Sequence, residues 1–236
     1  MSDLKNTAKI IQLGISDSKP LAQDLVHLYV IDMTTLQEMT GDLGAILNSE
    51  EQARAERFVN PKHGQHYRCV RGVLRRILSR YLNITPQAVN FAYAAHGKPL
   101  LQNDPALHFN LSHSHHMAAY AIRLEQEIGV DIEFMRPQKN LVGMIKHVAS
   151  PLEQDELNML TENDARQAFY RLWTRKEAFI KAVGRGLGMG LRSIHIGTQL
   201  CDASLAVAYK NQILPDWYIQ DIHAPTGYQL AVCSKY

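Results

Sequence analysis

Cysteine is scarce in this chain of 236 residues, which contains only Cys69, Cys201 and Cys233. The three lie far apart and show no spacing typical of metal ligands, so the sequence argues against a disulfide framework and against a zinc site. We therefore expect three reduced thiols. The chain also lacks low-complexity tracts and long Gly/Ser linkers, which means that any domain boundary must be short.

Long hydrophobic runs are missing as well. The longest unbroken apolar run, Met117–Ile122, is far too short to cross a bilayer, and the polar opening stretch Met1–Lys9 lacks the apolar core of a signal peptide. We expect a cytoplasmic protein without a membrane partner. A formal net charge of +2 is too small to predict nonspecific nucleic-acid binding, whereas 46% hydrophobic residues suffice for a real core.

Two carboxylates alternate with apolar residues in one short segment. Val130, Ile132 and Phe134 would lie on one face of a strand, and Asp131 and Glu133 on the other. Alpha carbons two positions apart in a strand are separated by roughly 6.5 to 7 Å, so both carboxylates could reach one hard divalent cation. Taken alone, such an alternation is most typical of a solvated face, where exposed acids contribute little to packing.

A helix is predicted for the segment that contains Trp173, Glu177 and Lys181. Apolar residues recur there at helical spacing, and Gly184 and Gly186 provide a stop signal. The three side chains would form one stripe along the helix. A glutamate four residues before a lysine is first of all an ordinary intrahelical ion pair, but its combination with the acidic strand favours a shared site.

The two segments together resemble the paired signature of a known family. The pattern Trp-x-x-Lys-Glu-Ala at 173–178, with Gly-Val-Asp-x-Glu upstream at 129–133, is similar to that of the 4'-phosphopantetheinyl transferases. Chain length, spacing and the Gly-Arg-Gly-Leu after the helix resemble the surfactin-synthetase-activator (Sfp-like) class. His-Gly-Lys-Pro at 96–99 and Phe-Asn-Leu-Ser-His-Ser at 109–114 match further family segments in the expected order.

The resemblance implies an α+β fold with a pseudo-twofold duplication of two similar α/β halves. Each half would be a small, mainly antiparallel sheet packed with helices, and the active site would lie in the cleft between the halves. We expect the first half, 1–124, to hold the 3'-phosphate and adenine side of coenzyme A and to dock the carrier. The second half, 125–236, would hold the metal site and the catalytic helix.

A repeated spacing in the sequence supports this duplication. Ser49 opens a predicted helix after Asp32, and Ser150 opens another after Glu133 at the same separation along the chain (32 to 49 and 133 to 150). A glutamate stands at capping-box distance from Ser150, as is typical of a helix start. The matched spacings indicate two halves with the same order of elements.

The family activity would be transfer of 4'-phosphopantetheine from coenzyme A to a serine of an apo acyl or peptidyl carrier protein, with release of 3',5'-ADP. The resemblance implies that Asp131, Glu133 and Glu177 bind Mg²⁺, for which Mn²⁺ could substitute. Hard carboxylate ligands suit this ion, which relieves repulsion at a phosphorus shielded by anionic oxygens. Glu177 is the candidate base for the serine, directly or through a metal-bound water, and Lys181 completes the predicted catalytic set.

Coenzyme-binding residues are implied in the same way. Lys98 lies in a Gly-Lys-Pro turn that could aim one ammonium at a phosphate, and Pro99 stiffens that turn. His113 is the family's coenzyme-contacting histidine. The predicted set for coenzyme A is Arg54, Arg68, Lys98, Pro99, Ser112, His113 and Lys181, with Lys176 as a weaker candidate. Glu51 stands where well-known members place a lysine, so the 3'-phosphate pocket could be built differently here.

Two further clusters allow more than one interpretation. His113, His115 and His116 could bind a transition metal, but without cysteines or a matching carboxylate spacing they are more typical of a polar loop. A group of arginines in the first half could be a solvated helix face or a surface for an acidic carrier protein. These are Arg71, Arg75, Arg76 and Arg80. We expect the protein to be a monomer.

Two other functions stay open from the sequence. The chain could be a catalytically silent homologue that holds coenzyme A or a carrier domain, although such a protein would not need a metal site. It could also be an unrelated magnesium-dependent nuclease or phosphohydrolase, which would cleave nucleotides without a carrier. A carrier, in turn, could be of fatty-acid, polyketide, nonribosomal-peptide or lysine-pathway type.

Overall fold

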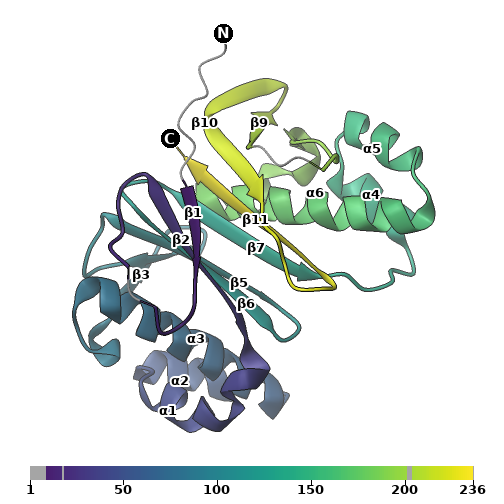
Figure 1. Ribbon diagram of the computed structural model, residues 1–236. Coiled ribbons are helices and arrows are strands. Elements are labelled where there is room, and N and C mark those ends of the chain that lie inside the picture. The colour runs from purple at the N-terminus through teal and green to yellow at the C-terminus, as the bar shows by residue number, and fades with distance from the viewer. Residues whose placement is uncertain (1–8, 18, 201–203, 236) are drawn as a thin grey trace.

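The computed structural model describes residues 9–17, 19–200 and 204–235 (Figure 1). The opening stretch 1–8 and Cys201, on which two of the expectations rest, lie outside the described residues. Cys69 and Cys233 are free and buried. Among the described helices, none is both long and apolar enough to cross a membrane.

The first half starts with two parallel strands and ends with an antiparallel hairpin. Its elements are β1 (Lys9–Leu13), β2 (Leu25–Asp32), α1 (Thr40–Ala45), α2 (Ser49–Glu56), α3 (Pro61–Leu82), β3 (Phe91–Tyr93), β4 (Pro99–Leu101), β5 (Leu107–Ser114) and β6 (Met117–Leu124), with 3-10 turns at Met33–Met39 and Pro86–Ala88. One sheet has the order β1-β2-β6-β5, and β3 pairs with β4 in a small ribbon.

The second half has a similar plan but starts with one strand, which helices and then antiparallel strands follow. Its elements are β7 (Ile128–Phe134), α4 (Leu141–Val148), α5 (Pro151–Asn158), α6 (Glu162–Val183), β8 (Ile194–His195), β9 (Leu205–Tyr209), β10 (Gln212–Asp221) and β11 (Tyr228–Lys235), with 3-10 turns at Leu187–Met189 and Leu191–Ser193. They form an antiparallel sheet of order β7-β11-β10-β9-β8.

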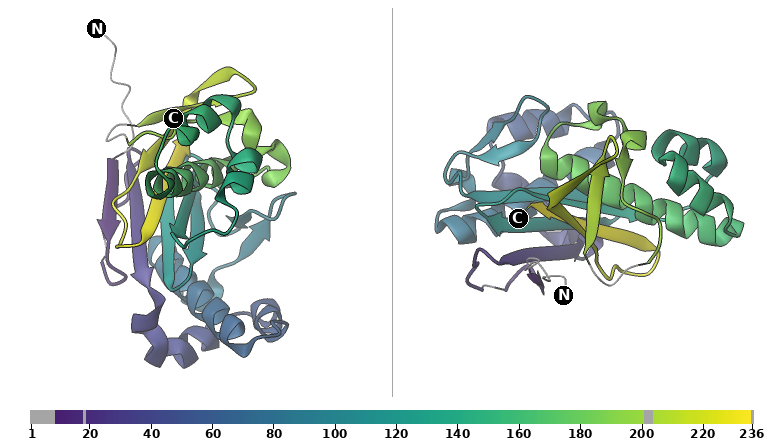
Figure 2. Two further views of the ribbon diagram at one scale, coloured as in Figure 1. Left: turned by 90° about the vertical axis from the view of Figure 1, so that its right-hand side faces the viewer. Right: turned by 90° about the horizontal axis from the view of Figure 1, so that it is seen from above.

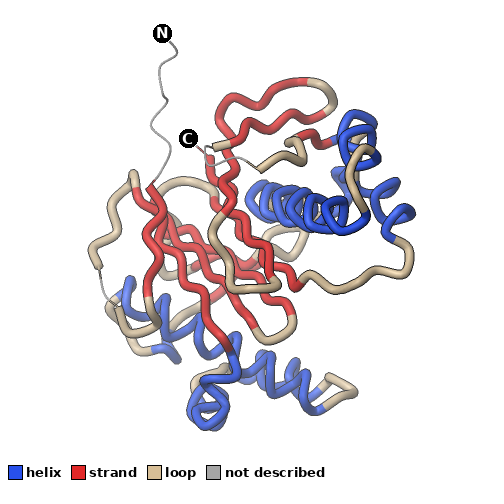
Figure 3. Tube along the Cα trace, turned by 45° about the vertical axis from the view of Figure 1, so that its right-hand side comes forward, coloured by secondary structure: helices blue, strands red, loops and turns tan. Residues whose placement is uncertain are grey.

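Four layers stack on one another in the order helix, sheet, sheet, helix. One face of the first sheet packs on α3 through Tyr29 and Tyr120, and its other face meets the second sheet through Val26 and Val130. The far face of the second sheet packs on α6, so the two helix groups lie on opposite outer sides (Figures 1, 2 and 3). Each sheet therefore has an apolar side toward its own long helix and another toward the other half.

The observed architecture confirms the α+β class. Both long helices, α3 and α6, contain 22 residues, and each follows a short helix with a capping box. The chain passes from the first sheet to the second between β6 and β7, close to residue 125. That 1–124 and 125–236 are separate domains stays a prediction.

A buried carboxylate anchors the short helix to the long helix in the first half. Glu51 completes the capping box of α2 with Asn48 and is 3% exposed. Its two oxygens accept from Arg71 Nε at 2.5 Å and from Arg75 Nε at 2.7 Å. Arg75, fully buried, also donates to the carbonyl oxygen of Val89 at 2.9 Å, which ties the end of α3 to the following loop.

These contacts overturn one expectation. Arg71 and Arg75 cannot belong to a surface for an acidic carrier, because both side chains are buried and paired. Only Arg76 and Arg80 of that group reach solvent. The Glu51 carboxylate is used inside the protein, and a 3'-phosphate pocket built differently from that of well-known members stays a prediction. Sequence spacing could not show this pairing, because the partner of the two arginines belongs to a different helix.

The second half contains a matching anchor. Glu153 caps α5 with Ser150, and its Oε2 accepts from Lys176 Nζ at 2.5 Å. Both side chains have no solvent exposure, and Lys176 also donates to the carbonyl oxygen of Val148 at 2.8 Å. Lys176 is therefore a structural residue rather than a phosphate ligand.

We expect the substitution Glu51→Ala to lower the free energy of unfolding by about 3 to 5 kcal/mol, because it leaves two buried guanidinium groups without their carboxylate. Guanidinium chloride unfolding followed by circular dichroism would measure the change. Glu50→Ala, one residue earlier on the exposed side of the same helix turn, is the control and should stay within about 0.5 kcal/mol of the parent. Equal stability of the two variants would contradict the anchor.

Candidate active site

Strand β7 and helix α6 approach each other unusually closely at Gly129. A Cβ atom at this position would lie 2.0 Å from the carbonyl oxygen of Ala178 and 2.5 Å from the amide nitrogen of Ala182. Only glycine permits such a contact between a strand and a helix backbone. The glycine of the Gly-Val-Asp motif therefore brings the stripe of α6 that bears Glu177 and Lys181 onto the acidic strand.

Asp131 lies at the centre of this junction and is only 2% exposed. Its Oδ1 accepts from Ser112 Oγ at 2.8 Å and from Lys181 Nζ at 2.5 Å, whereas its buried Oδ2 has no hydrogen-bond partner among the described residues. Burial raises the pKa of Asp131, and the Lys181 ammonium and the Ser112 hydroxyl partly oppose that rise. The expectation of an exposed cleft acid is wrong here, because α6 and β5 cover the strand.

Glu133 lies two residues further along the same face and is half-buried. Its Oε2 accepts from Ser114 Oγ at 2.7 Å, and the same hydroxyl accepts from the amide nitrogen of Phe134 at 3.1 Å. Desolvation raises the pKa of Glu133, and the neighbouring Asp131 carboxylate adds to the rise. Ser114 therefore orients this carboxylate, a role that alternation in the sequence does not indicate.

Glu177 faces the two strand carboxylates from α6. Desolvation raises its pKa to about 6, Asp131 and Glu133 act in the same direction, and Lys181 opposes them. Lys181, one turn later, also donates to Ser112 Oγ at 2.9 Å. The structure thus brings the four predicted catalytic residues together, with one ammonium and three carboxylates in one cluster.

Three polar side chains of β5 hold the two halves together beside this cluster. Asn110 Oδ1 accepts from the amide nitrogen of Val130 at 2.9 Å, and Ser112 and Ser114 bind the two carboxylates described above. Asn110 and Ser112 are nearly buried, so they face the neighbouring strand rather than solvent. The polar face of β5 therefore meets the second half.

His113 follows Ser112 on β5 and lies beside His66 of α3, with ring centroids 5.0 Å apart. As a residue, His113 is exposed. Desolvation lowers the pKa of His113 to about 4, and the nearby His66 and Lys181 act in the same direction. His113 therefore lies beside the acidic cluster, and its role as a coenzyme contact stays a prediction.

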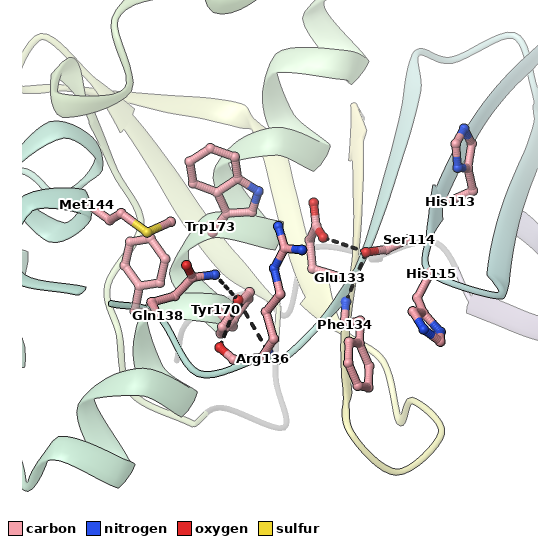
Figure 4. A pocket seen from close by; sticks show the side chains of 11 residues that line it. His113, Ser114, His115, Glu133, Phe134, Arg136, Gln138, Met144, Tyr170 and Trp173 are labelled. Carbon is pink, nitrogen blue, oxygen red and sulfur yellow. Dashed lines mark hydrogen bonds between the residues drawn. The ribbon is translucent and has the colours of Figure 1, made fainter. Parts of the chain in front are cut away.

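A cavity of about 480 Å³ opens beside Glu133. Figure 4 shows Glu133 between Ser114 on one side and Arg136 and Trp173 on the other. Its wall includes Tyr170, whose hydroxyl oxygen accepts from Gln138 Nε2 at 2.6 Å. The lining is His113, Ser114, His115, Glu133, Phe134, Arg136, Gln138, Met144, Phe169, Tyr170 and Trp173. Phe169, Tyr170 and Trp173 of this lining belong to one segment of α6, which also matches the family in sequence, whereas Arg136, Gln138 and Met144 had no signal in the sequence.

The remaining predicted coenzyme residues lie elsewhere in the structure. Lys98 Nζ donates to the carbonyl oxygen of Ala182 at 2.7 Å and to the carboxylate of Glu127, and Pro99 follows it at the start of β4. The guanidinium of Arg54 is exposed and lies over the Tyr67 ring, 5.4 Å from its centroid. Arg68 Nε donates to Gln52 Oε1 at 3.4 Å. No hydrogen bond or ion pair between described residues links these two arginines directly to the acidic cluster.

His115 and His116 form the turn after β5. Their Nδ1 atoms are 2.5 Å apart, and Tyr228 Oη lies 3.2 Å from His116 Nδ1. Within the described part of the chain, no group of three His, Cys, Asp or Glu side chains is arranged to hold a metal ion. In the acidic cluster, Lys181 binds the carboxylate of Asp131 and Ser114 binds that of Glu133.

Comparisons with known proteins agree along most of the chain. The model of the 4'-phosphopantetheinyl transferase superfamily matches residues 127–233, and that of the N-terminal part of 4'-phosphopantetheinyl transferases matches 35–124. The 4'-phosphopantetheinyl transferase HetI of Nostoc sp. is 36% identical over 205 residues, which cover 86% of this chain and 84% of HetI. The 4'-phosphopantetheinyl transferase Sfp of Bacillus subtilis is 28% identical over 207 residues, covering 87% of this chain and 90% of Sfp.

A solved structure, the holo-[acyl-carrier-protein] synthase of Thermotoga maritima, matches 46% of this chain and 62% of its own, with 15% identity and a TM-score of 0.36. Fold and site together define a two-half α+β enzyme with an acidic centre at the junction of its halves. The chain belongs to the 4'-phosphopantetheinyl transferase superfamily. Its activity is therefore that of a phosphopantetheinyl-transferring enzyme.

Gly129→Ala should strongly impair activity, because the added methyl group forces β7 away from α6 and separates the carboxylates of the strand from Glu177. We expect at least about a hundredfold loss of turnover, the size of effect that a misplacement of about 1 Å can cause. Gly41→Ala in α1 is the matched control, since a Cβ there meets no atom within 4 Å. Full activity of the Gly129 variant would contradict the proposed role of the close contact.

The clustered charges also predict a pH effect on stability in the absence of metal. The raised pKa of Glu177 means that the folded protein binds its proton more tightly than the unfolded chain, so stability is lost as pH rises from about 4.5 through about 6. Glu177→Gln should therefore raise the free energy of unfolding by about 1 to 2 kcal/mol at pH 8, with the gain fading toward pH 5. Chemical unfolding with a chelator at several pH values would test this. A gain independent of pH would contradict it.

Proposed function

We propose that this chain acts in the cytoplasm to transfer the 4'-phosphopantetheine group of coenzyme A to a serine of an apo acyl or peptidyl carrier protein, with release of 3',5'-ADP. The observation that carries the proposal is the meeting of Asp131, Glu133, Glu177 and Lys181 at the junction of the halves. These are the residue types that phosphoryl chemistry needs, namely oxygen ligands for a hard cation and one ammonium for phosphate.

The donor set of the site fits Mg²⁺, with Mn²⁺ as a possible substitute. Asp131 Oδ2 is a buried oxygen without a partner, which is costly unless a ligand satisfies it. Burial raises the pKa of Asp131, Glu133 and Glu177, and repulsion from neighbouring acids adds to the rise for Glu133 and Glu177, so a bound cation would stabilise their charged forms. When bound, the cation would offset charge on the pyrophosphate and the leaving phosphate.

The protein residues have distinct proposed tasks in the transfer. Lys181 would leave Asp131 to contact the pyrophosphate, and Glu177, with a pKa near 6, would take the proton of the carrier serine. The serine oxygen then bonds to the phosphorus of the phosphopantetheine group, and the bond from that phosphorus to the bridging oxygen breaks, so that the electron pair leaves with 3',5'-ADP. His113 and Ser112 would line the coenzyme beside Lys181.

The cavity next to Glu133 suits the pantetheine arm of the coenzyme. Its wall alternates aromatic surfaces from Trp173 and Tyr170 with polar groups from Gln138 and Arg136. Pantetheine alternates methyl and methylene groups with amides, so such a lining can cover both kinds of group. The arm would then extend from the cluster toward α4.

A monomer is the proposed working unit. Strand β5 of one half and β7 with α6 of the other provide the clustered side chains within a single chain. The site therefore needs no second copy. The apo carrier protein is the proposed partner, and its docking surface must avoid the buried Arg71 and Arg75.

Asp131→Ala should reduce transfer at saturating Mg²⁺ and coenzyme A by roughly a hundredfold or more. The reason is that a carboxylate ligand holds the cation, which stabilises the charge of the transition state by several kcal/mol. The measurement is intact-mass analysis of several apo carrier proteins, which gain one phosphopantetheine per reactive serine. Glu162→Gln, an exposed acid in the first turn of the same catalytic helix, is the control and should transfer normally. Near-normal transfer by the Asp131 variant would refute the assignment, and parent protein that binds coenzyme A without modifying any carrier would support the silent homologue.

A further inference from the structure

Lys98 has partners in both halves of the molecule. It belongs to the turn between β3 and β4 in the first half, yet its ammonium donates to the carbonyl oxygen of Ala182 at the end of α6 and to the carboxylate of Glu127 just before β7. Its side chain is 9% exposed, although the turn itself lies at the surface. The charged group is therefore held inside the junction and not presented to solvent.

The bond to Ala182 closes a helix end. The last carbonyl groups of a helix lack intrahelical partners and carry a partial negative charge. A lysine that binds one of them supplies the missing hydrogen bond and offsets the negative charge of the helix end. Helix α6 ends at Val183, and Gly184 adopts the left-handed conformation that follows it, with φ 72°. Lys98 is thus a cap that one half supplies to the catalytic helix of the other.

The backbone around this contact is shaped to receive the lysine. A Cβ at Gly184 would lie 3.1 Å from Lys98 Cδ, so the lysine stem passes directly over the glycine. Two backbone hydrogen bonds close the turn. The amide of Gly97 donates to the carbonyl oxygen of Ala94 at 2.8 Å, and the amide of Ala94 donates to the carbonyl oxygen of Lys98 at 2.9 Å. Gly97 has φ 81°, which fixes the direction in which Lys98 leaves the turn.

We propose that Lys98 is a positioning residue, which together with Glu127 fixes the end of α6 against the first half and thereby sets Lys181 and Glu177 relative to β7. The proposal rests on the proposed transferase function for its catalytic readout. It differs from the phosphate contact that the family resemblance implies for this lysine. As a phosphate ligand, Lys98 would have to give up the carbonyl and carboxylate that now surround it.

The two roles predict opposite effects of removing Glu127. If Lys98 binds a phosphate, Glu127 competes with the coenzyme, and Glu127→Gln should tighten coenzyme A binding. If Lys98 positions α6, Glu127→Gln should act in the same direction as Lys98→Met, because it removes the ion pair that holds the Lys98 ammonium at the carbonyl oxygen of Ala182. Glu125→Gln is the control, since this exposed acid in the same connection contacts Gln23 and not Lys98.

The first measurement does not depend on catalysis. Hydrogen exchange of the full-length protein, followed by mass spectrometry, should show faster exchange in peptides covering residues 176–186 for Lys98→Met and for Glu127→Gln, but not for Glu125→Gln. Lys98→Arg, which keeps the charge and donors, should restore much of the protection. Unchanged exchange in both variants would overturn the proposal, whatever the enzyme's substrate proves to be.

The second measurement separates turnover from coenzyme affinity. With an apo carrier, both variants should lose roughly three- to tenfold in kcat, and the double variant should lose no more than the worse single one, as expected for two residues that act as a unit. Coenzyme A affinity measured by calorimetry should stay within about twofold. A tenfold weaker affinity for Lys98→Met together with tighter binding by Glu127→Gln would return Lys98 to the phosphate site. If no carrier is modified even by the parent protein, the transferase proposal fails, while the exchange result still decides the positioning role.

Discussion

The polar seam between β5 and β7 is the contact on which the site depends. These are the adjoining edge strands of two different sheets, and in the described ladders they do not pair through their backbones. Side chains join them instead, as Asn110 binds a β7 amide while Ser112 and Ser114 bind carboxylates. Because a buried carboxylate is costly without donors, Ser112 of the first half helps to stabilise Asp131, beside Lys181 of its own half. The same side chains of β5 therefore stabilise the junction and orient the carboxylates of the site.

The duplication is symmetric in its anchors but not in its site. Each half uses a capping-box glutamate to bind a buried basic residue of its long helix. On the face of β2 that packs against α3, Tyr29 and Ile31 take the positions that Asp131 and Glu133 take in β7. Arg76 stands at the same offset from the start of α3 (61 to 76) as the glutamate of the site from the start of α6 (162 to 177). At these three corresponding positions, only the second half therefore has carboxylates.

Local features of the site could be predicted from the sequence, whereas its surroundings could not. Alternation placed Val130 and Ile132 in the core and both acids on the opposite face, and helical spacing put Glu177 and Lys181 on one stripe. The burial of Asp131 depends on elements that are distant in sequence, so periodicity gave the wrong exposure.

The arginines of α3 show the same limit. Spacings of four residues describe a stripe but do not tell which stripe faces the core, and a carboxylate elsewhere in the chain makes burial of the charges possible. The repeated spacing between the end of a strand and the start of a helix did indicate the duplication. The repeated spacing paired Asp32 with Glu133. In the structure, Ile31 is the residue of β2 that corresponds to Glu133, because both side chains lie on the face toward the long helix of their own half.

The ammonium of Lys181 acts as a resident counter-ion for Asp131 in the free protein. The divalent cation proposed for this site would have to compete with Lys181 for the same oxygen, which would weaken binding of the cation alone. A cation that arrives together with a pyrophosphate meets a different balance, because the displaced ammonium gains an anionic partner at once. Binding of the cation and binding of the pyrophosphate would then reinforce each other. The site would therefore bind an ion that accompanies a pyrophosphate better than a bare ion.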